Sequence, residues 1–175
     1  MPETEVNTMA NSDTNPGSIA LNWWSKNIKP RENSSAKALS ARLRRAATLD
    51  ALCEPAVHEL YESLQRNSEL KRIAAERISR LVCLLAEVRD HNKNKTLAQC
   101  LGGGKTAVMS PLRFQKLMRV EGDELAASLR RAILMADCCC NVASLANDIL
   151  YWGDMVRRRW CFHYYGSDVP GNSPV

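Results

Sequence analysis

The chain is poor in the features that mark membrane proteins, secreted proteins and β-sheet proteins. It contains no run of about 18 apolar residues, so no segment is suited to span a membrane as a helix. The N-terminal segment lacks the basic start and apolar stretch of a signal peptide, and we expect a cytoplasmic protein. No convincing alternation of apolar and polar residues is present, which argues against β-strands.

The sequence also lacks the patterns of common catalytic and metal sites. It contains no C-x-x-C, H-E-x-x-H or G-x-S-x-G motif, and its three histidines are widely separated. Seven cysteines are present, but the adjacent Cys138, Cys139 and Cys140 would project in different directions from a helix and chelate poorly. We therefore predict no catalytic residues, no metal and no cofactor, and we expect the cysteines to be reduced and buried.

The segment QCLGGGKTA (99–107) resembles a phosphate-binding loop but departs from its pattern. The pattern G-x-x-x-x-G-K-[ST] requires a glycine at position 99, where this chain has Gln99. The segment follows no predicted strand and lies in a polar connection between predicted helices. We expect no nucleotide binding here, and only Lys105 to contribute, as one more positive charge near a nucleic-acid backbone.

Apolar residues recur at intervals of three and four along nearly the whole chain, which is the spacing of amphipathic helices. With 175 residues, the chain is long enough for one compact domain with a real core. We predict an all-α helical bundle of about seven to nine helices over residues 19–166, which could form two packed halves divided near residues 90–110. The acidic segment 1–18 and the segment 167–175 are predicted to be disordered tails.

Polar residues that precede apolar repeats predict where helices begin. Ser18 is expected to cap the first helix, and Ser34 or Ser35 the second. The longest helix is expected over residues 68–88, and Asp123 is expected to cap a helix in the second half. The four tryptophans occur at helical spacing, which favours burial in the core over stacking on bases.

The charge of the chain is positive and unevenly distributed. Residues 21–175 contain 24 basic and 16 acidic residues, a net charge of +8, and Glu32 is the only acid between positions 19 and 49. Three consecutive arginines at 157–159 are followed by no acid until position 168. Concentrated positive charge favours a polyanionic partner such as nucleic acid, although a mildly basic soluble surface is the alternative explanation.

Several predicted helices carry basic residues that lack acidic neighbours at ion-pairing distance along the helix. They lie in ARLRRAA (41–47), PLRFQKLMR (111–119) and ASLRRAI (127–133). Unpaired guanidinium groups repel one another unless an anion lies between them, and their planar fork suits phosphate. These residues therefore favour contact with a polyanion, with a solvated basic face as the alternative.

Four motifs follow an early tryptophan helix in a specific order. They are ARLRRA (41–46), SPLRFQKLMR (110–119), LRRA (129–132) and LANDILYWGDMVRRRWCFHYY (145–165). Each motif alone is weak evidence for a family. Their order, their spacing and the chain length together resemble the CasB family, the small subunit of the type I-E CRISPR surveillance complex Cascade. The resemblance covers residues 19–166.

The resemblance implies a non-catalytic, helical, RNA- and DNA-binding subunit of an antiviral, RNA-guided complex. Members of the family contact the crRNA and target DNA backbone, help to hold the displaced strand of the R-loop, and usually occur as two copies beside the other Cascade subunits. Sequence is read by the guide RNA, so a positively charged channel without base-reading motifs is expected. We expect neither a membrane nor a small-molecule substrate among the partners of the protein.

The motifs supply ten candidate nucleic-acid-binding residues. Six come from matching motifs, two are added on position alone, and two lie on a helix that could instead serve a contact between subunits. The six are Arg44, Arg45, Arg113, Arg119, Arg130 and Arg131; the two additions are Arg42 and Lys116; the last two are Arg157 and Arg158. A basic helical adaptor that docks an acidic protein partner is the alternative function.

Overall fold

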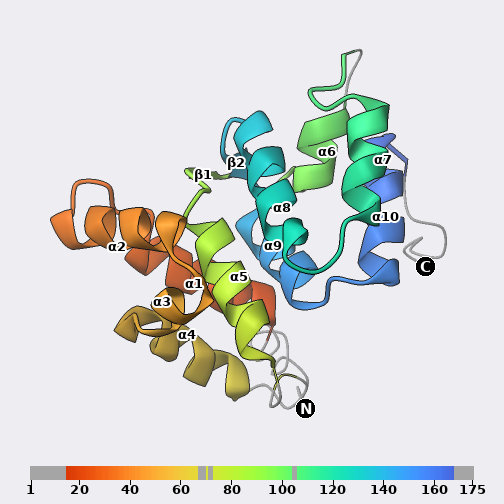
Figure 1. Cartoon of the computed structure of the whole chain (residues 1–175). Helices are drawn as coiled ribbons and strands as arrows, with labels where there is room; N and C mark the ends of the chain where they lie inside the picture. Colours follow the sequence, from red (N-terminus) through yellow and green to blue (C-terminus); the bar gives the residue numbers. More distant parts are fainter. Residues whose placement is uncertain (1–14, 67–69, 71–72, 104–105, 168–175) are drawn as a thin grey trace, which may run out of the picture.

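The computed structural model describes residues 15–66, 70, 73–103 and 106–167, which form ten helices and one pair of two-residue strands (Figure 1). The predicted all-α class is confirmed. The count exceeds the expected seven to nine because short segments such as α3 form separate helices. The elements are α1 (Pro16–Asn27), α2 (Ser34–Arg45), α3 (Thr48–Leu52), α4 (Pro55–Gln65), α5 (Ala75–Leu85), β1 (Asp90–His91), α6 (Leu97–Gly102), α7 (Pro111–Arg119), α8 (Glu124–Met135), β2 (Cys139–Cys140), α9 (Val142–Leu150) and α10 (Asp154–Tyr164).

The first two helices are capped by asparagines and not by the predicted serines. The Asn15 side chain accepts a hydrogen bond from the Gly17 amide at 2.8 Å, and the Asn33 side chain accepts one from the Ser35 amide at 2.9 Å. The first helix therefore begins before Ser18. Asparagine and serine are both good N-caps, so the local sequence did not decide between neighbouring candidates.

Two other predicted helix boundaries also differ. The helix expected over residues 68–88 is described as α5, which begins at Ala75 and ends at Leu85; the predicted start at Ser68 lies outside the described residues. Asp123 precedes α8 as predicted, but its side chain makes no capping hydrogen bond because its own backbone is already helical. The predicted tails also fall largely on residues 1–14 and 168–175, outside the described part of the chain.

Helix α9 lies at the centre of the molecule, between α1 and α5 on one side and the remaining C-terminal helices on the other (Figure 1). The contact between α1 and α9 is unusually close at Gly17, where an added Cβ would lie 2.4 Å from the Ala143 carbonyl oxygen. The buried side chains of both halves form one continuous hydrophobic core. The N-terminal and C-terminal helices are therefore packed on a shared centre.

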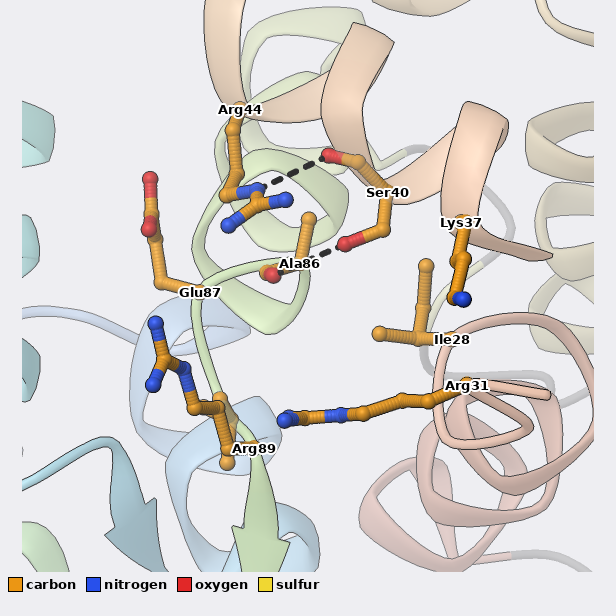
Figure 2. A pocket seen from close by; sticks show the side chains of 9 residues that line it. Ile28, Arg31, Lys37, Ser40, Arg44, Ala86, Glu87 and Arg89 are labelled. Atoms are coloured by element: carbon orange, nitrogen blue, oxygen red, sulfur yellow. Dashed lines mark hydrogen bonds between the residues drawn. The ribbon is translucent and has the colours of Figure 1, made fainter. Parts of the chain in front are cut away.

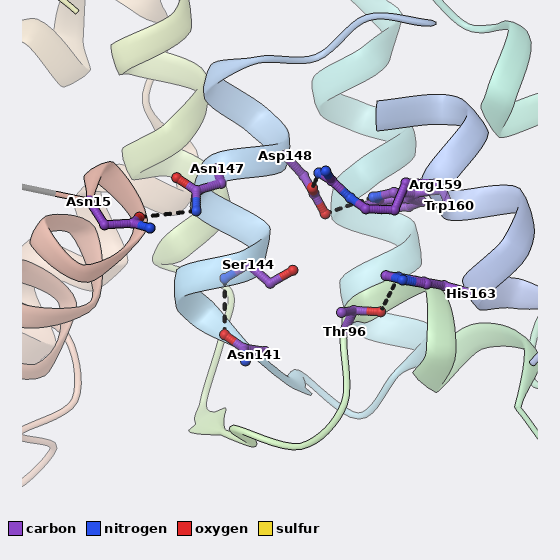
Figure 3. A network of polar contacts seen from close by, with 9 residues as sticks. All are labelled: Asn15, Thr96, Asn141, Ser144, Asn147, Asp148, Arg159, Trp160 and His163. Atoms are coloured by element: carbon purple, nitrogen blue, oxygen red, sulfur yellow. Dashed lines mark hydrogen bonds and ion pairs between the residues drawn. The ribbon is translucent and has the colours of Figure 1, made fainter. Parts of the chain in front are cut away.

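Polar contacts hold α9 to both of its neighbours (Figure 3). On one side, the Asn147 amide donates to the Asn15 side chain at 3.2 Å. On the other, the buried Asp148 carboxylate accepts a hydrogen bond from the Trp160 indole at 2.7 Å and pairs with Arg159. Burial raises the pKa of Asp148, while the two donors on α10 act in the opposite direction. The pair therefore fixes α10 against the core.

The run of three cysteines forms a turn and a short strand, a role that the sequence did not indicate. Asp137 and Cys138 both have left-handed backbone conformations, with φ of 54° and 57°, and they turn the chain out of α8. Residues Cys139 and Cys140 then pair in parallel with β1. The pairing joins the end of the N-terminal helices to the middle of the C-terminal half.

The glycines of QCLGGGKTA serve helix packing. Gly102 ends α6 against α10, and an added Cβ would lie 2.0 Å from the Tyr164 carbonyl oxygen. The Tyr164 ring stacks on Phe114 of α7, with ring centroids 4.0 Å apart, and so extends this contact to a third helix. Lys105 lies outside the described residues.

The tryptophans confirm the expected preference for the core. Trp23, Trp24 and Trp160 are buried, and Trp152 packs edge-on against Trp160 from a partly buried position. The aromatic side chains therefore stabilise the bundle.

Candidate nucleic-acid interface

Basic side chains gather at two concave surfaces of the molecule. The first, which we call the α2 pocket, is an open pocket of about 240 Å³ between α2 and the segment that follows α5. The second, which we call the α7–α8 groove, has a volume of about 530 Å³ and lies between α7 and α8. The ten candidate residues divide among these surfaces, ion pairs elsewhere and exposed positions.

The α2 pocket is lined by four cationic side chains from three segments (Figure 2). Lys37 and Arg44 lie seven residues apart on one side of α2, which is two helical turns. Arg31 comes from the loop between α1 and α2, and Arg89 from the segment after α5. In Figure 2 the Arg31 side chain extends from the loop toward Arg89, and Arg44 lies on the opposite side of Glu87 from Arg89. Only Arg44 of these four belongs to the predicted set.

The floor of the α2 pocket is the segment 86–89, which several elements hold in place. The Ser40 hydroxyl of α2 donates to the Ala86 carbonyl, and the Trp24 indole of α1 donates to the Val88 carbonyl, each at 3.3 Å. The Arg89 amide donates to the Cys138 carbonyl at 2.7 Å, beside β2. The backbone that carries Arg89 is therefore fixed from three directions.

One carboxylate, Glu87, is present among the described residues that line the α2 pocket. Its Oε1 atom lies 2.9 Å from Arg130 Nε of α8, in an ion pair without an aligned hydrogen bond. The Glu87 side chain is only 10% exposed. Arg130, a predicted contact residue, is therefore occupied by a carboxylate that faces the pocket.

The α7–α8 groove contains three of the predicted residues. Arg113 and Lys116 lie one turn apart on α7, and Arg131 lies across from them on α8. The Arg131 guanidinium donates to the Ser128 hydroxyl at 3.1 Å, which directs it along α8. Glu124 also lines the groove, so its net positive charge is smaller than the residue count suggests.

Arg42 contradicts the expectation that the basic residues of α2 lack acidic partners. Its guanidinium makes two hydrogen bonds to Glu54, with nitrogen–oxygen distances of 2.5 and 2.9 Å. These hydrogen bonds from Arg42 are the main reason that the pKa of Glu54 is lowered. Glu54 precedes α4, twelve residues away, so no pattern within the helix could reveal the pair. Arg45 lies next to it on the same shallow surface.

Arg157 is also held by acidic groups within the fold. It lies 3.2 Å from Glu121 and 3.7 Å from Asp154, and it donates to the Val120 carbonyl at 3.4 Å. Only 20% of its side chain is exposed. Arg157 therefore ties α10 to the connection between α7 and α8.

Arg119 and Arg158 are exposed and lie outside both concave surfaces. Neither forms an ion pair with a carboxylate among the described residues. Their charges are therefore available to a partner on the open surface.

Arg31 and Arg89 are pocket residues that the motifs in the sequence did not select. Arg31 belongs to the acid-poor stretch before position 49, which was a usable signal. Arg89 lies between Glu87 and Asp90 in the sequence, which made it look locally neutral. Its importance depends on the pairing of Glu87 with α8, which only the fold reveals.

The described residues contain no group of three or more histidine, cysteine or acidic side chains that could hold a metal ion. Cys53 and Cys161 are exposed, against the expectation of buried thiols. Burial raises the pKa of the Cys138 and Cys140 thiols, which makes them poor nucleophiles. In the part of the chain that the structure covers, no helix is both long and apolar enough to cross a membrane.

Comparisons with known proteins give consistent results. The family model for CRISPR-associated protein Cse2 matches residues 40–165. A curated protein described as CRISPR-associated protein Cse2, from Thermus thermophilus, is 32% identical over 84 residues, which are 45% of this chain and 48% of that protein. The match therefore spans about half the length of that relative.

Two solved structures from Thermus thermophilus share the fold. A crystal structure of CasB has a TM-score of 0.61, and a crystal structure of a Cse2-family CRISPR-associated protein has a TM-score of 0.65. Each is 24% identical in sequence and covers 87% of this chain and 99% of the solved chain.

Proposed function

Because the chain belongs to the CRISPR-associated Cse2 family, we propose that it is a non-catalytic, nucleic-acid-binding subunit of a type I-E Cascade complex. In this role it contacts the backbone of the crRNA and target DNA and stabilises the displaced non-target strand of the R-loop. Its partners are the nucleic acids, the other Cascade subunits and a second copy of itself, in the cytoplasm.

The observation that carries the proposal is the pair of concave basic surfaces that α8 connects. Arg130 of α8 contacts the carboxylate at the α2 pocket, and the adjacent Arg131 lines the α7–α8 groove. Contacts of arginine and lysine with phosphates position a strand without reading its sequence. This fits a complex in which base pairing with the guide supplies the specificity.

The proposal assigns contact residues according to their surroundings. Arg42 and Arg157 are left out because carboxylates within the fold already hold them. Arg130 is assigned an indirect role, through Glu87. The proposed contacts are Arg31, Lys37, Arg44 and Arg89 in the α2 pocket, Arg113, Lys116 and Arg131 in the α7–α8 groove, and the exposed Arg45, Arg119 and Arg158.

The test is the binding of single-stranded DNA and RNA oligonucleotides, measured by fluorescence anisotropy over a range of salt concentrations. Counterion release predicts that log K falls linearly with log salt, with a slope of about −0.7 for each phosphate contacted. Four to six contacts would give a slope of roughly −3 to −4. A polyglutamate chain of equal charge serves as the control polyanion.

Tighter binding of the oligonucleotides than of polyglutamate is expected at every salt concentration. Equal or tighter binding of polyglutamate would instead support the basic adaptor for an acidic protein. Absence of oligonucleotide binding at low salt, both by the free subunit and by the assembled complex that contains it, would contradict the proposed function.

A further inference from the structure

Resting on the proposed function, we propose that the α2 pocket binds one phosphate group of a nucleic-acid backbone, and that Arg130 is a positioning residue that holds Glu87 away from the pocket cations. The pocket contains Arg31, Lys37, Arg44 and Arg89, and Arg130 approaches it from α8. The two parts of this proposal depend on each other, because Glu87 would otherwise neutralise the site.

The charge of the α2 pocket favours an anion. None of the four pocket cations has a carboxylate oxygen within 4.0 Å among the residues that the structure describes. Arg44 donates only to the Ser40 carbonyl of its own helix, at 3.3 Å. Four like charges that line one pocket repel one another, and an anion bound in the pocket offsets this repulsion. The pocket is thus electrostatically prepared for an anion.

The size and shape of the pocket suit a small group. A volume of about 240 Å³ lies below the range of about 300–1,000 Å³ that is typical of pockets for drug-sized ligands. A phosphate group fits such a space more readily than an entire cofactor does. Arginine forks from different segments can each offer two N–H groups to the oxygens of one phosphate, while Lys37 supplies a point charge from the side.

The floor of the pocket is rigid. Segment 86–89 is fixed by hydrogen bonds to α1, to α2 and to the Cys138 carbonyl. Arg89 therefore starts from a backbone that does not need to be ordered when the ligand binds. Preorganisation of this kind reduces the entropic loss on binding.

Glu87 is the one acidic group that could oppose anion binding in the pocket as the structure describes it. Figure 2 places Glu87 between Arg44 and Arg89 at the edge of the pocket. Its pairing with Arg130 at 2.9 Å occupies a carboxylate that could otherwise pair with these two pocket arginines. Loss of Arg130 would release a mostly buried negative charge beside the phosphate site. Arg130 therefore promotes anion binding without touching the anion.

The pocket is tested first with inorganic phosphate and the full chain, by following the arginine Nε–Hε signals in NMR spectra. We expect the signals of Arg31, Arg44 and Arg89 to shift together and saturate, while that of the exposed Arg66 shifts less and does not saturate. Equal, non-saturating shifts of all these arginines would overturn the phosphate site. This result is independent of oligonucleotide binding, so it separates failure of the pocket from failure of the proposed function.

A pair of double variants then compares the pocket with the open surface. Arg44→Gln with Arg89→Gln removes two pocket charges, and Arg66→Gln with Lys93→Gln removes two exposed charges outside both concave surfaces. We expect the pocket variant to bind a single-stranded oligonucleotide about tenfold or more weakly, because hydrogen bonds to charged groups are lost. The surface variant should lose less than about threefold. Equal losses in the two variants would overturn the pocket.

The positioning role of Arg130 is tested by rescue. Arg130→Gln is expected to weaken oligonucleotide binding about fivefold to tenfold, and the double change Glu87→Gln with Arg130→Gln should restore it. The matched control is Arg130→Gln with Glu59→Gln, which has the same net charge but keeps the Glu87 carboxyl group in place. Restoration only in the Glu87 double variant supports the proposal. Equal weakness of both double variants would mean that Arg130 contacts the strand directly.

Circular dichroism melting accompanies each variant, because Arg130→Gln leaves a mostly buried carboxylate unpaired. If that single variant does not fold, the double change Glu87→Gln with Arg130→Gln is compared with the unaltered chain. Equal affinity of the two then supports the positioning role, and a loss of about tenfold or more overturns it.

Discussion

Helices α2 and α10 carry arginine runs that look alike in the sequence but have different surroundings in the fold. Arg44 of α2 faces a pocket with other cations, whereas Arg157 and Arg159 of α10 are both paired with carboxylates from other elements. Each helix also contains an exception: Arg42 of α2 is paired with Glu54, and Arg158 of α10 is exposed. The role of an arginine in this protein therefore depends on the acid that a distant segment supplies.

The largest expected effect on stability comes from removing Asp148, the buried acid that pairs with α10. Asp148→Ala deletes the partner of Arg159 and leaves the buried Trp160 indole without an acceptor. We expect the free energy of unfolding to fall by about 3 kcal/mol, because the buried indole loses its acceptor and Arg159 loses a hydrogen bond between charged groups. Urea denaturation measures the effect. Arg158→Ala on the same helix is the control, with an expected loss of less than about 0.5 kcal/mol.

The next test compares two neighbouring arginines of α10, Arg157 and Arg158. Arg157→Ala should lower the free energy of unfolding by about 1 kcal/mol, because it removes hydrogen bonds to a charged group and to the Val120 carbonyl. It should leave oligonucleotide affinity nearly unchanged, whereas Arg158→Ala should weaken affinity about twofold without affecting stability. Stability is measured by melting and affinity by fluorescence anisotropy. If Arg157→Ala weakens affinity and leaves stability unchanged, Arg157 faces the nucleic acid.

The smallest effect concerns the Arg42–Glu54 pair of α2. Because the folded pKa of Glu54 is lowered, the pair stabilises the fold above the unfolded pKa, near 4.5, and this contribution disappears as pH falls through the folded pKa. We expect Glu54→Gln to flatten the decline in stability below pH 4.5. If stability declines below pH 4.5 equally in Glu54→Gln and in the unaltered chain, Arg42 and Glu54 do not form this pair in solution.

Much of the fold followed from periodicity, since apolar residues at helical spacing identified the all-α class and the buried tryptophans. The family assignment made from motif order is also confirmed. Helix starts were less certain because Asn15 and Asn33 lie close to serines with similar capping ability. The β1–β2 pair was not predictable, since two-residue strands leave no repeating pattern and Asp90 pairs with Cys139 far along the chain.

The candidate site was predictable only in part. The motifs directed attention to Arg44, Arg113 and Arg131, all of which line concave surfaces. They could not show that Arg42 is occupied by Glu54, nor that Arg89 joins Arg44, because those relations cross between helices that are distant in sequence. Charge counts identify how many cations a chain has, and only tertiary structure shows which of them are unpaired.

The anchoring of segment 86–89 has a consequence for the order of events during folding. The Trp24 indole reaches Val88 across 64 residues and the Ser40 hydroxyl reaches Ala86 across 46, while Arg130 and Cys138 contact the segment from the other direction. Contacts with such long sequence separations form late, because the loops between them must close first. A nascent chain that ends before Arg130 has all four pocket cations but lacks both the Cys138 carbonyl that anchors Arg89 and the partner of Glu87. Competence for phosphate binding would thus be gained only when nearly the whole chain has been synthesised and folded.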